Sequence, residues 1–118
     1  MDDIAKNKEQ AIQLAGTLKD HKALDVIVID LRTHCDWTDY FVIATATSMG
    51  HKSGLHRHVL DFCAEQGLEL ANKKKREDDA DEWLLLDFGF MVVHILTQSA
   101  RQFYDLESLW YQGQMTRL

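Results

Sequence analysis

The 118-residue chain is long enough for one hydrophobic core and too short for two, so we expect one domain over residues 1–118. Hydrophobic residues make up 46% and charged residues 27%, which is ordinary for a soluble globular protein. No apolar run approaches the roughly 18 residues that span a bilayer, and the N-terminus lacks the pattern of a signal peptide. We therefore expect a cytoplasmic protein that makes no membrane contact.

The charge balance also bears on the partner. Thirteen basic and nineteen acidic residues give a net charge of −6. Affinity for nucleic acid depends largely on Lys and Arg at phosphates, so this charge disfavours bare RNA as the main ligand. A basic protein is a better match, although the same charge also serves solubility alone. The two cysteines, Cys35 and Cys63, form no metal pattern and are expected to stay reduced.

The first half of the chain predicts a helix followed by two strands. Apolar residues at helical spacing predict the helix from about residue 3 to residue 21. The β-branched run 25–31 predicts a strand that is apolar on both faces and hence central in a sheet. Residues 33–38 are expected to form a loop, and residues 40–46 the second strand.

The middle of the chain predicts a second helix and a polar loop. Ser48 is a good N-cap for this helix, and Gly67 is placed to end it in the left-handed conformation. Residues 68–71 are a candidate short third strand. Residues 72–81 carry almost nothing apolar and are expected to be solvated.

Residues 83–95 predict a β-hairpin with Phe88 and Gly89 as its two-residue turn, because Gly89 can supply the positive φ of such turns. Side chains alternate along strands. One face is then aliphatic and should pack beneath helices: Leu84, Leu86, Met91, Val93 and Ile95. In this register Asp87 pairs with Phe90, Leu85 with Val92, and Trp83 with His94. The second face therefore carries Trp83, Leu85, Asp87, Phe90, Val92 and His94.

The second face mixes aromatic, aliphatic and ionisable groups, as the centres of protein interfaces do. By periodicity alone, a half-exposed face partly covered by the C-terminal helix is an equal alternative. That helix begins either at Thr97 or at a capping box of Ser99 and Gln102. The order of elements predicts an α/β sandwich, a single domain with a mixed sheet of about five strands flanked by helices.

No set of residues forms a recognisable catalytic or metal site. The offsets among His51, His56 and His58 place them on different faces of the second helix, which favours a solvated polar face over a zinc site. The tripeptide 87–89 spells a kinase metal-binding motif, but the rest of a kinase is missing. We therefore expect neither catalytic residues nor a cofactor.

Several segments resemble the ribosomal silencing factor family, also called Iojap-like proteins. They are residues 38–43, Trp83 with Asp87 and His94, and residues 103–107 with Trp110, within a similarity that runs from about residue 24 to residue 110. The resemblance implies a nucleotidyltransferase-like fold without its catalytic residues. It also implies binding to the large ribosomal subunit through its fourteenth ribosomal protein, which sterically prevents small-subunit joining and represses translation.

The nucleotidyltransferase chemistry needs a Gly-Ser turn and paired carboxylates that hold metal ions. Here Gly50 is followed by His51, and the Asp-x-Asp at 79–81 lies in the acidic loop. An enzyme with an unrecognised site remains one alternative function. A homodimeric scaffold that uses the same sheet face is the other.

The family resemblance and the exposed face of the hairpin together predict the partner-binding residues: Asp39, Trp83, Leu85, Asp87, Phe90, His94, Tyr104, Asp105, Glu107 and Trp110. Phe90 stands where the family usually has an acidic residue. A basic run is a candidate for auxiliary contact with ribosomal RNA: Lys73, Lys74, Lys75 and Arg76. Five nearby acids cancel most of its field, so a solvated loop is the default interpretation.

Overall fold

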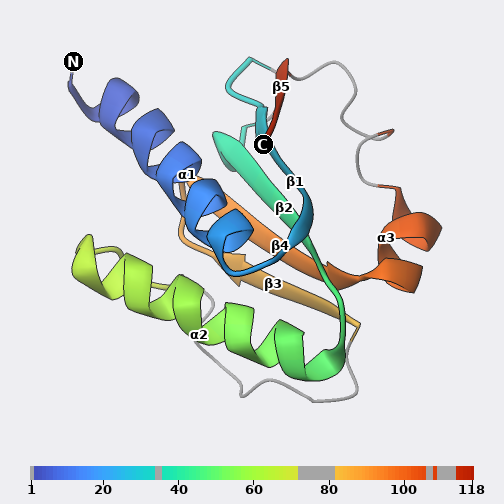
Figure 1. Cartoon of the computed structure of the whole chain (residues 1–118). Coiled ribbons are helices and arrows are strands. Elements are labelled where there is room, and N and C mark those ends of the chain that lie inside the picture. The colour runs from blue at the N-terminus through green and yellow to red at the C-terminus, as the bar shows by residue number, and fades with distance from the viewer. Residues whose placement is uncertain (1, 34–35, 72–81, 106–107, 109–113) are drawn as a thin grey trace.

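The computed structural model describes residues 2–33, 36–71, 82–105, 108 and 114–118 (Figure 1). In chain order the elements are α1 (Asp2–Asp20), β1 (Leu24–Asp30), β2 (Tyr40–Ala46), α2 (Met49–Glu65), β3 (Trp83–Asp87), β4 (Met91–Thr97), α3 (Gln98–Tyr104) and β5 (Gln114–Arg117). No helix in this described part is both long enough and apolar enough to cross a membrane.

The strands form one sheet in the order β3-β4-β2-β1-β5. β2 and β4 pair in parallel, and the other neighbours pair antiparallel, so the sheet is mixed. Helices α1 and α2 lie together over one face of the sheet, whereas α3 lies apart from them, beyond the end of β4 (Figure 1). The expected α/β sandwich with five strands is confirmed.

The fifth strand is not the one that the sequence predicted. Residues 68–71 form no strand; Leu68 and Leu70 pack against the core beneath the helices, and Ala71 N–H donates to the carbonyl of Asp87 at 2.6 Å. Instead β5 pairs with β1 and completes the sheet. The two leucines fit the core better than the sheet edge, because both can be partly buried there at once.

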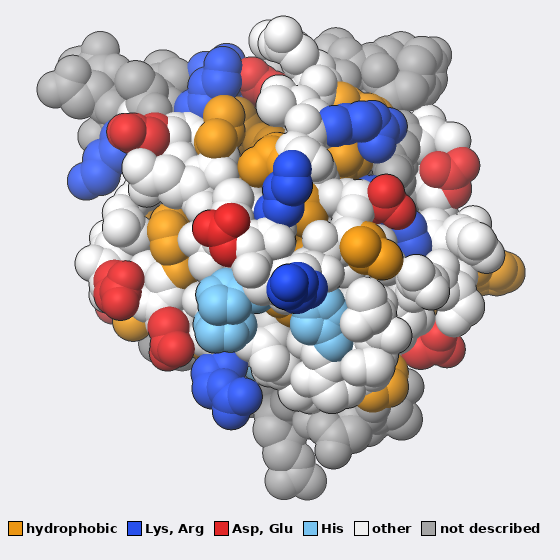
Figure 2. All heavy atoms as spheres, in the orientation of Figure 1, with side chains coloured by type: hydrophobic (Ala, Val, Ile, Leu, Met, Phe, Trp, Pro, Cys, Tyr) orange, Lys and Arg blue, Asp and Glu red, His pale blue; other side chains and the backbone are white. Residues whose placement is uncertain are grey.

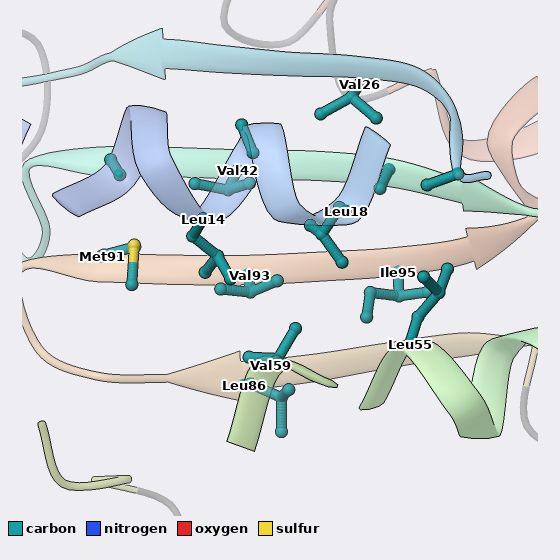
Figure 3. Close-up of a cluster of buried hydrophobic side chains, with 14 of the residues drawn as sticks. Leu14, Leu18, Val26, Val42, Leu55, Val59, Leu86, Met91, Val93 and Ile95 are labelled. Carbon is teal, nitrogen blue, oxygen red and sulfur yellow. The ribbon is translucent and has the colours of Figure 1, made fainter. Parts of the chain in front are cut away.

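The main core lies between the sheet and helices α1 and α2 (Figure 3). Leu14 and Leu18 of α1 and Leu55 and Val59 of α2 are fully buried in it. The aliphatic hairpin face points into this core as expected: Leu86, Met91, Val93 and Ile95 are buried, and Leu84 packs against them. We call this side of the sheet the helix-covered face.

The helix ends follow the predicted caps. The Ser48 hydroxyl accepts the His51 backbone N–H at 3.0 Å, and Gly67 adopts a φ of +73° beyond the end of α2. Thr97, rather than Ser99, begins α3, since its hydroxyl accepts the Ala100 N–H at 3.3 Å. The choice between the two starts is thereby settled.

The hairpin register differs from the expected one by two residues. Asp87 pairs with Val92, Leu85 with His94, and Trp83 with Leu96. The connection therefore widens to residues 88–90, with Gly89 at a φ of +88°. Because side chains alternate with a period of two, a shift of two residues leaves every paired residue on its expected face.

Phe90 is the exception, and its expected position was wrong. The wider loop takes it out of the strand, and it packs, half-buried, against the helix-covered core together with the buried Phe88. Asp87 holds this loop in shape, because its Oδ1 accepts the Gly89 N–H at 2.8 Å. Burying two aromatic rings favours the wider turn over the tight one.

Candidate partner-binding surface

The other side of the sheet, which we call the α3 face, has a small core of its own. It consists of Ile27, Ile29, Leu31, Phe41, Ile43, Val92, Leu96 and Ala100. Among the described elements only α3, which is seven residues long, packs over this face, and Trp83 packs against its edge. The α3 face is therefore the less covered side of the sheet within the described part of the chain.

Six rings on the α3 face follow one another in contact. We call them the aromatic strip: Trp37, Phe41, His94, Trp83, Tyr104 and Phe103. The successive distances between ring centroids are 5.7, 4.4, 5.8, 4.7 and 4.9 Å. Favourable aromatic pairs have centroids about 4.5–7 Å apart, and all five distances lie in or just below that range. The strip runs from the loop before β2, across β2, β4 and β3, to the end of α3.

The strip is buried in its middle and exposed at both ends. Phe41 and His94 are 3% and 2% exposed, whereas Trp37 is 59% and Phe103 80% exposed. Tyr104 and Leu85 lie in between, at 46% and 42%. Large exposed apolar side chains that share one surface mark interaction sites more often than scattered ones do. The strip thus offers two aromatic anchors on a rigid support.

Charged side chains are spread over the opposite side of the molecule. Figure 2 shows the helix-covered face, where Lys, Arg, Asp, Glu and His side chains are interspersed and the hydrophobic areas between them are small. Such a surface is typical of one that remains in solvent. The contrast between the two faces favours the α3 face as the functional one.

His94 holds the centre of the strip by a hydrogen bond. Trp83 Nε1–H donates to His94 Nδ1 at 3.0 Å. Burial lowers the pKa of His94 to about 4, so the ring is neutral at neutral pH. His94 Nε2 is buried and meets no hydrogen-bond acceptor among the described residues.

Arg101 fastens α3 to the sheet. Arg101 is 8% exposed, and its guanidinium donates to the Thr45 hydroxyl and to the backbone carbonyl of Asp25, each at 2.8 Å. At the N-terminus of α3, Glu82 accepts hydrogen bonds from the hydroxyls of Thr97 at 2.8 Å and Ser99 at 2.9 Å. These bonds lower the pKa of Glu82. Phe103 and Tyr104 are therefore presented by an anchored helix.

The structure brings most of the expected residues to this surface, with differences in exposure. Trp83, Leu85, Asp87, His94 and Tyr104 lie on it, but His94 is buried and Trp83 only half-exposed. Phe90 lies on the other side of the sheet, as described above. Glu107 and Trp110 lie outside the described residues, as does the basic run 73–76.

The expected acids flank the strip and also have local roles. Asp39 follows Trp37 by two residues and is half-buried. Asp105 ends α3 in the left-handed conformation, at a φ of +39°, and its Oδ2 accepts the Ser108 hydroxyl at 2.6 Å. Asp87 holds the hairpin turn. Replacing Asp87 or Asp105 would therefore disturb the backbone as well as the charge.

Trp37, Phe41 and Phe103 were missed as site residues by sequence reasoning. Phe103 was part of the family resemblance, and an isolated Trp in a polar loop was a usable signal. Phe41 could not be assigned to a face, because its position depends on the parallel pairing of β2 with β4, in which Ile43 lies opposite His94. Parallel register between strands far apart in sequence has no local signal.

The other side chains that could be reactive, three histidines and a cysteine, are engaged in local contacts or buried. His51 Nε2 donates to the His21 carbonyl at 2.8 Å, and the His21 and His58 rings stack at 3.6 Å. Within the described ranges, no group of three or more His, Cys, Asp or Glu residues is arranged to hold a metal ion. Burial raises the pKa of the Cys63 thiol to about 12, which makes it a poor nucleophile.

Comparison with known proteins decides the family. The family model described as "Ribosomal silencing factor during starvation" matches residues 4–118, which include the whole aromatic strip. This chain belongs to the ribosomal silencing factor family. It is 41% identical over 100 residues to the ribosomal silencing factor of Treponema pallidum, and the match covers 85% of this chain and 88% of that protein.

Relatives extend to organelles and to solved structures. The mouse mitochondrial assembly of ribosomal large subunit protein 1 is 35% identical over 98 residues, which are 82% of this chain but only 43% of that protein. A crystal structure from Chromobacterium violaceum has a TM-score of 0.77 at 29% identity and covers 92% of this chain and 86% of that chain. One from Bacillus halodurans has a TM-score of 0.74 at 27% identity, covering 93% and 99%. The silencing-factor fold is thus shared over nearly the whole chain.

Proposed function

We propose that this chain binds the large ribosomal subunit through its fourteenth ribosomal protein and sterically blocks joining of the small subunit. The observation that carries the proposal is the aromatic strip, with Trp37 and Phe103 exposed at its ends. Family membership supports the ribosome as the target, and the printed name of the mouse relative points to the large subunit. In this proposal the protein acts as a repressor by occupying a surface and carries out no reaction.

The chemistry of the strip favours a basic protein as the partner. Asp36 and Asp39 stand on either side of Trp37, and Asp105 follows Tyr104. Aromatic faces flanked by carboxylates attract Arg and Lys side chains, through cation–π contact and charge together. The net charge of −6 acts in the same direction over longer distances.

Sedimentation with separated ribosomal subunits tests the partner. The tagged protein should co-sediment with the large subunit and not with the small one. Phe103→Ala and Trp37→Ala should each weaken binding by about 30-fold, as expected when an interface loses a large aromatic anchor. Both side chains are mostly exposed, so the fold should survive.

Leu60→Ala is the matched control. Leu60 lies on α2, over the helix-covered face, and is 38% exposed, so its loss removes surface apolar area without touching the strip. Binding should remain unchanged. Equal loss in all three variants, or co-sedimentation with the small subunit, would refute the proposed surface.

A subunit-joining assay tests the mechanism. Adding the protein to separated subunits should lower the yield of joined ribosomes without any nucleotide, and Phe103→Ala should restore the yield. In parallel, incubation with each nucleoside triphosphate and divalent metals should release no pyrophosphate. Normal joining at saturating protein would reject steric blocking, and steady pyrophosphate release would favour an enzyme.

A further inference from the structure

We propose that His94 is the positioning residue of the partner-binding surface: through its Nδ1 it fixes the Trp83 indole, and through the indole it fixes Tyr104. The inference rests on the proposed function, since partner binding is what the positioning would serve. The contacts are continuous, with Trp83 Nε1 3.0 Å from His94 Nδ1 and the Trp83 and Tyr104 ring centroids 4.7 Å apart.

The hydrogen bond defines the chemical state of His94. An indole Nε1–H can only donate, so His94 Nδ1 must be the unprotonated, accepting nitrogen. The single proton of the neutral ring is then on Nε2. A protonated ring would place two N–H groups against each other at 3.0 Å and break the contact. The geometry thus assigns the neutral Nε2–H form.

The pairing of the strands explains why Trp83 needs such a support. Trp83 begins the edge strand β3 and lies directly opposite Leu96, whereas His94 lies opposite Leu85. The indole must therefore lean diagonally across the hairpin to reach His94. The torsion that turns an aromatic ring is broad, so packing alone leaves its orientation loosely defined. A directional bond in a buried site, out of competition with water, selects one orientation.

Burying His94 costs stability that an apolar side chain at the same position would not cost. Its neighbours on the same strand face are Val92 and Leu96, both buried and apolar. A histidine between them leaves a buried Nε2–H without an acceptor among the described residues, which is unfavourable. Departures from apolar packing inside a sheet are expected where a residue serves function.

Three variants separate the effect of losing the hydrogen bond between Trp83 and His94 from the effect of changing side-chain volume. His94→Phe keeps a ring but removes the acceptor. His94→Asn places an amide oxygen near the Nδ1 position and restores the acceptor. Trp83→Phe keeps an aromatic ring at Trp83 but removes the donor. Urea unfolding of each variant shows which are folded. Trp83→Phe changes a residue at the sheet edge, so it can still test the loss of the hydrogen bond if His94→Phe fails to fold.

Two measurements then test the positioning. The first is the indole N–H resonance of Trp83 in a ¹⁵N-labelled chain, assigned by its disappearance in Trp83→Phe. His94→Phe should shift it upfield and speed its exchange with solvent, and His94→Asn should restore it. The second is large-subunit binding, which His94→Phe and Trp83→Phe should each weaken by about 3- to 10-fold, the value of one hydrogen bond. Their effects should not add in the double variant, and His94→Asn should bind like the unaltered chain.

The outcomes distinguish the two proposals. If the unaltered chain binds and the folded variants bind equally well, the positioning role of His94 is wrong while the proposed function stands. If the unaltered chain does not bind the large subunit, the proposed function is wrong, and the resonance alone decides whether His94 orients Trp83. An unshifted Trp83 resonance in His94→Phe overturns the inference in either case.

Discussion

His94 is 2% exposed, and burial lowers its pKa to about 4 from an ordinary value of 6.5. Between those two pH values the unfolded chain binds a proton at this histidine and the folded chain does not. The free energy of unfolding therefore rises with pH across this window. The contribution of neutral His94 is complete above about pH 6.5 and is lost as the pH falls toward 4.

We predict that the chain loses about 3 kcal/mol of stability between pH 7 and pH 4 through His94, from the difference between the two pKa values. Urea unfolding at several pH values measures this loss, with His94→Asn as the control that lacks a titrating ring. The slope of stability against pH should flatten in the control. Parallel slopes in the two proteins would show that His94 is not the group responsible.

Asp30 contributes in a separate pH range. The hydrogen bond and ion pair with Arg32, at 2.7 Å, lower the pKa of this carboxyl below 3.8. A lowered carboxyl pKa stabilises the fold above 3.8 and loses that effect only as the pH falls further. The Arg32 side chain is 37% exposed, so solvent weakens the pair. Glu82, whose pKa is also lowered, acts below its ordinary value of 4.5. Loss of stability between about pH 6.5 and 4.5 is therefore assigned to His94 and not to these two carboxyls.

Among the elements, the β3–β4 hairpin depends on one glycine. Gly89 has a φ of +88°, and a Cβ added there would meet nothing within 4 Å. Gly89→Ala should therefore cost only the conformational strain of a left-handed residue, about 1–2 kcal/mol. Chemical denaturation measures the cost.

The matched variant Gly54→Ala should have the opposite sign. Gly54 lies inside α2, and a Cβ there also meets nothing within 4 Å. Alanine in a helix interior is more favourable than glycine by roughly 0.5–1 kcal/mol, so this variant should be stabilised. A Gly89→Ala protein as stable as the original chain would mean that the turn can adopt another conformation.

The elements also show what the sequence could predict. α1, β2 and α2 were recovered closely, because apolar periodicity and the Ser48 and Gly67 caps are local signals. β5 was missed because its four residues have no apolar alternation and are defined by pairing with β1, more than 80 positions earlier in the chain. The hairpin register was wrong by two residues, since two phenylalanines turn inward instead of forming a tight turn.

The candidate site was predictable in part for the same reason. Alternation placed Trp83, Leu85 and His94 on one face despite the wrong register. It could not show that His94 is buried, because that depends on Phe41 from β2 and on the packing of α3. The exposed ends of the strip likewise depend on how distant segments meet.

At the scale of the whole molecule, the two sides of the sheet are covered unequally. Two long helices cover one side, and the seven-residue α3 is the described helix on the other. A strip with buried central rings and exposed terminal ones needs no conformational change to receive a partner. Under the proposed function, silencing by occupancy requires a lasting complex, so the lifetime of the complex is the quantity that mutations should change most.

Charge should affect the rate of association with the large subunit more than the lifetime of the complex. We predict that Asp36→Lys combined with Asp39→Lys slows association with the large subunit and weakens binding by up to about fivefold. Each replacement places a positive charge beside Trp37, where it would repel the proposed basic partner. Within the described part of the chain, neither side chain makes a hydrogen bond that holds a turn, as Asp87 does. Stopped-flow or surface-based association rates at two salt concentrations measure the effect, which should shrink at high salt.

Asp20→Lys is the control for net charge. Asp20 is exposed at the end of α1, over the helix-covered face, so its reversal changes the total charge as one of the two strip substitutions does. A slowing confined to the strip variant would locate the partner's basic groups opposite Trp37. Equal slowing by Asp20→Lys would instead mean that overall charge alone guides the encounter. Faster association of the strip variant would point to phosphate groups at this end of the surface, and so to ribosomal RNA in place of a basic protein.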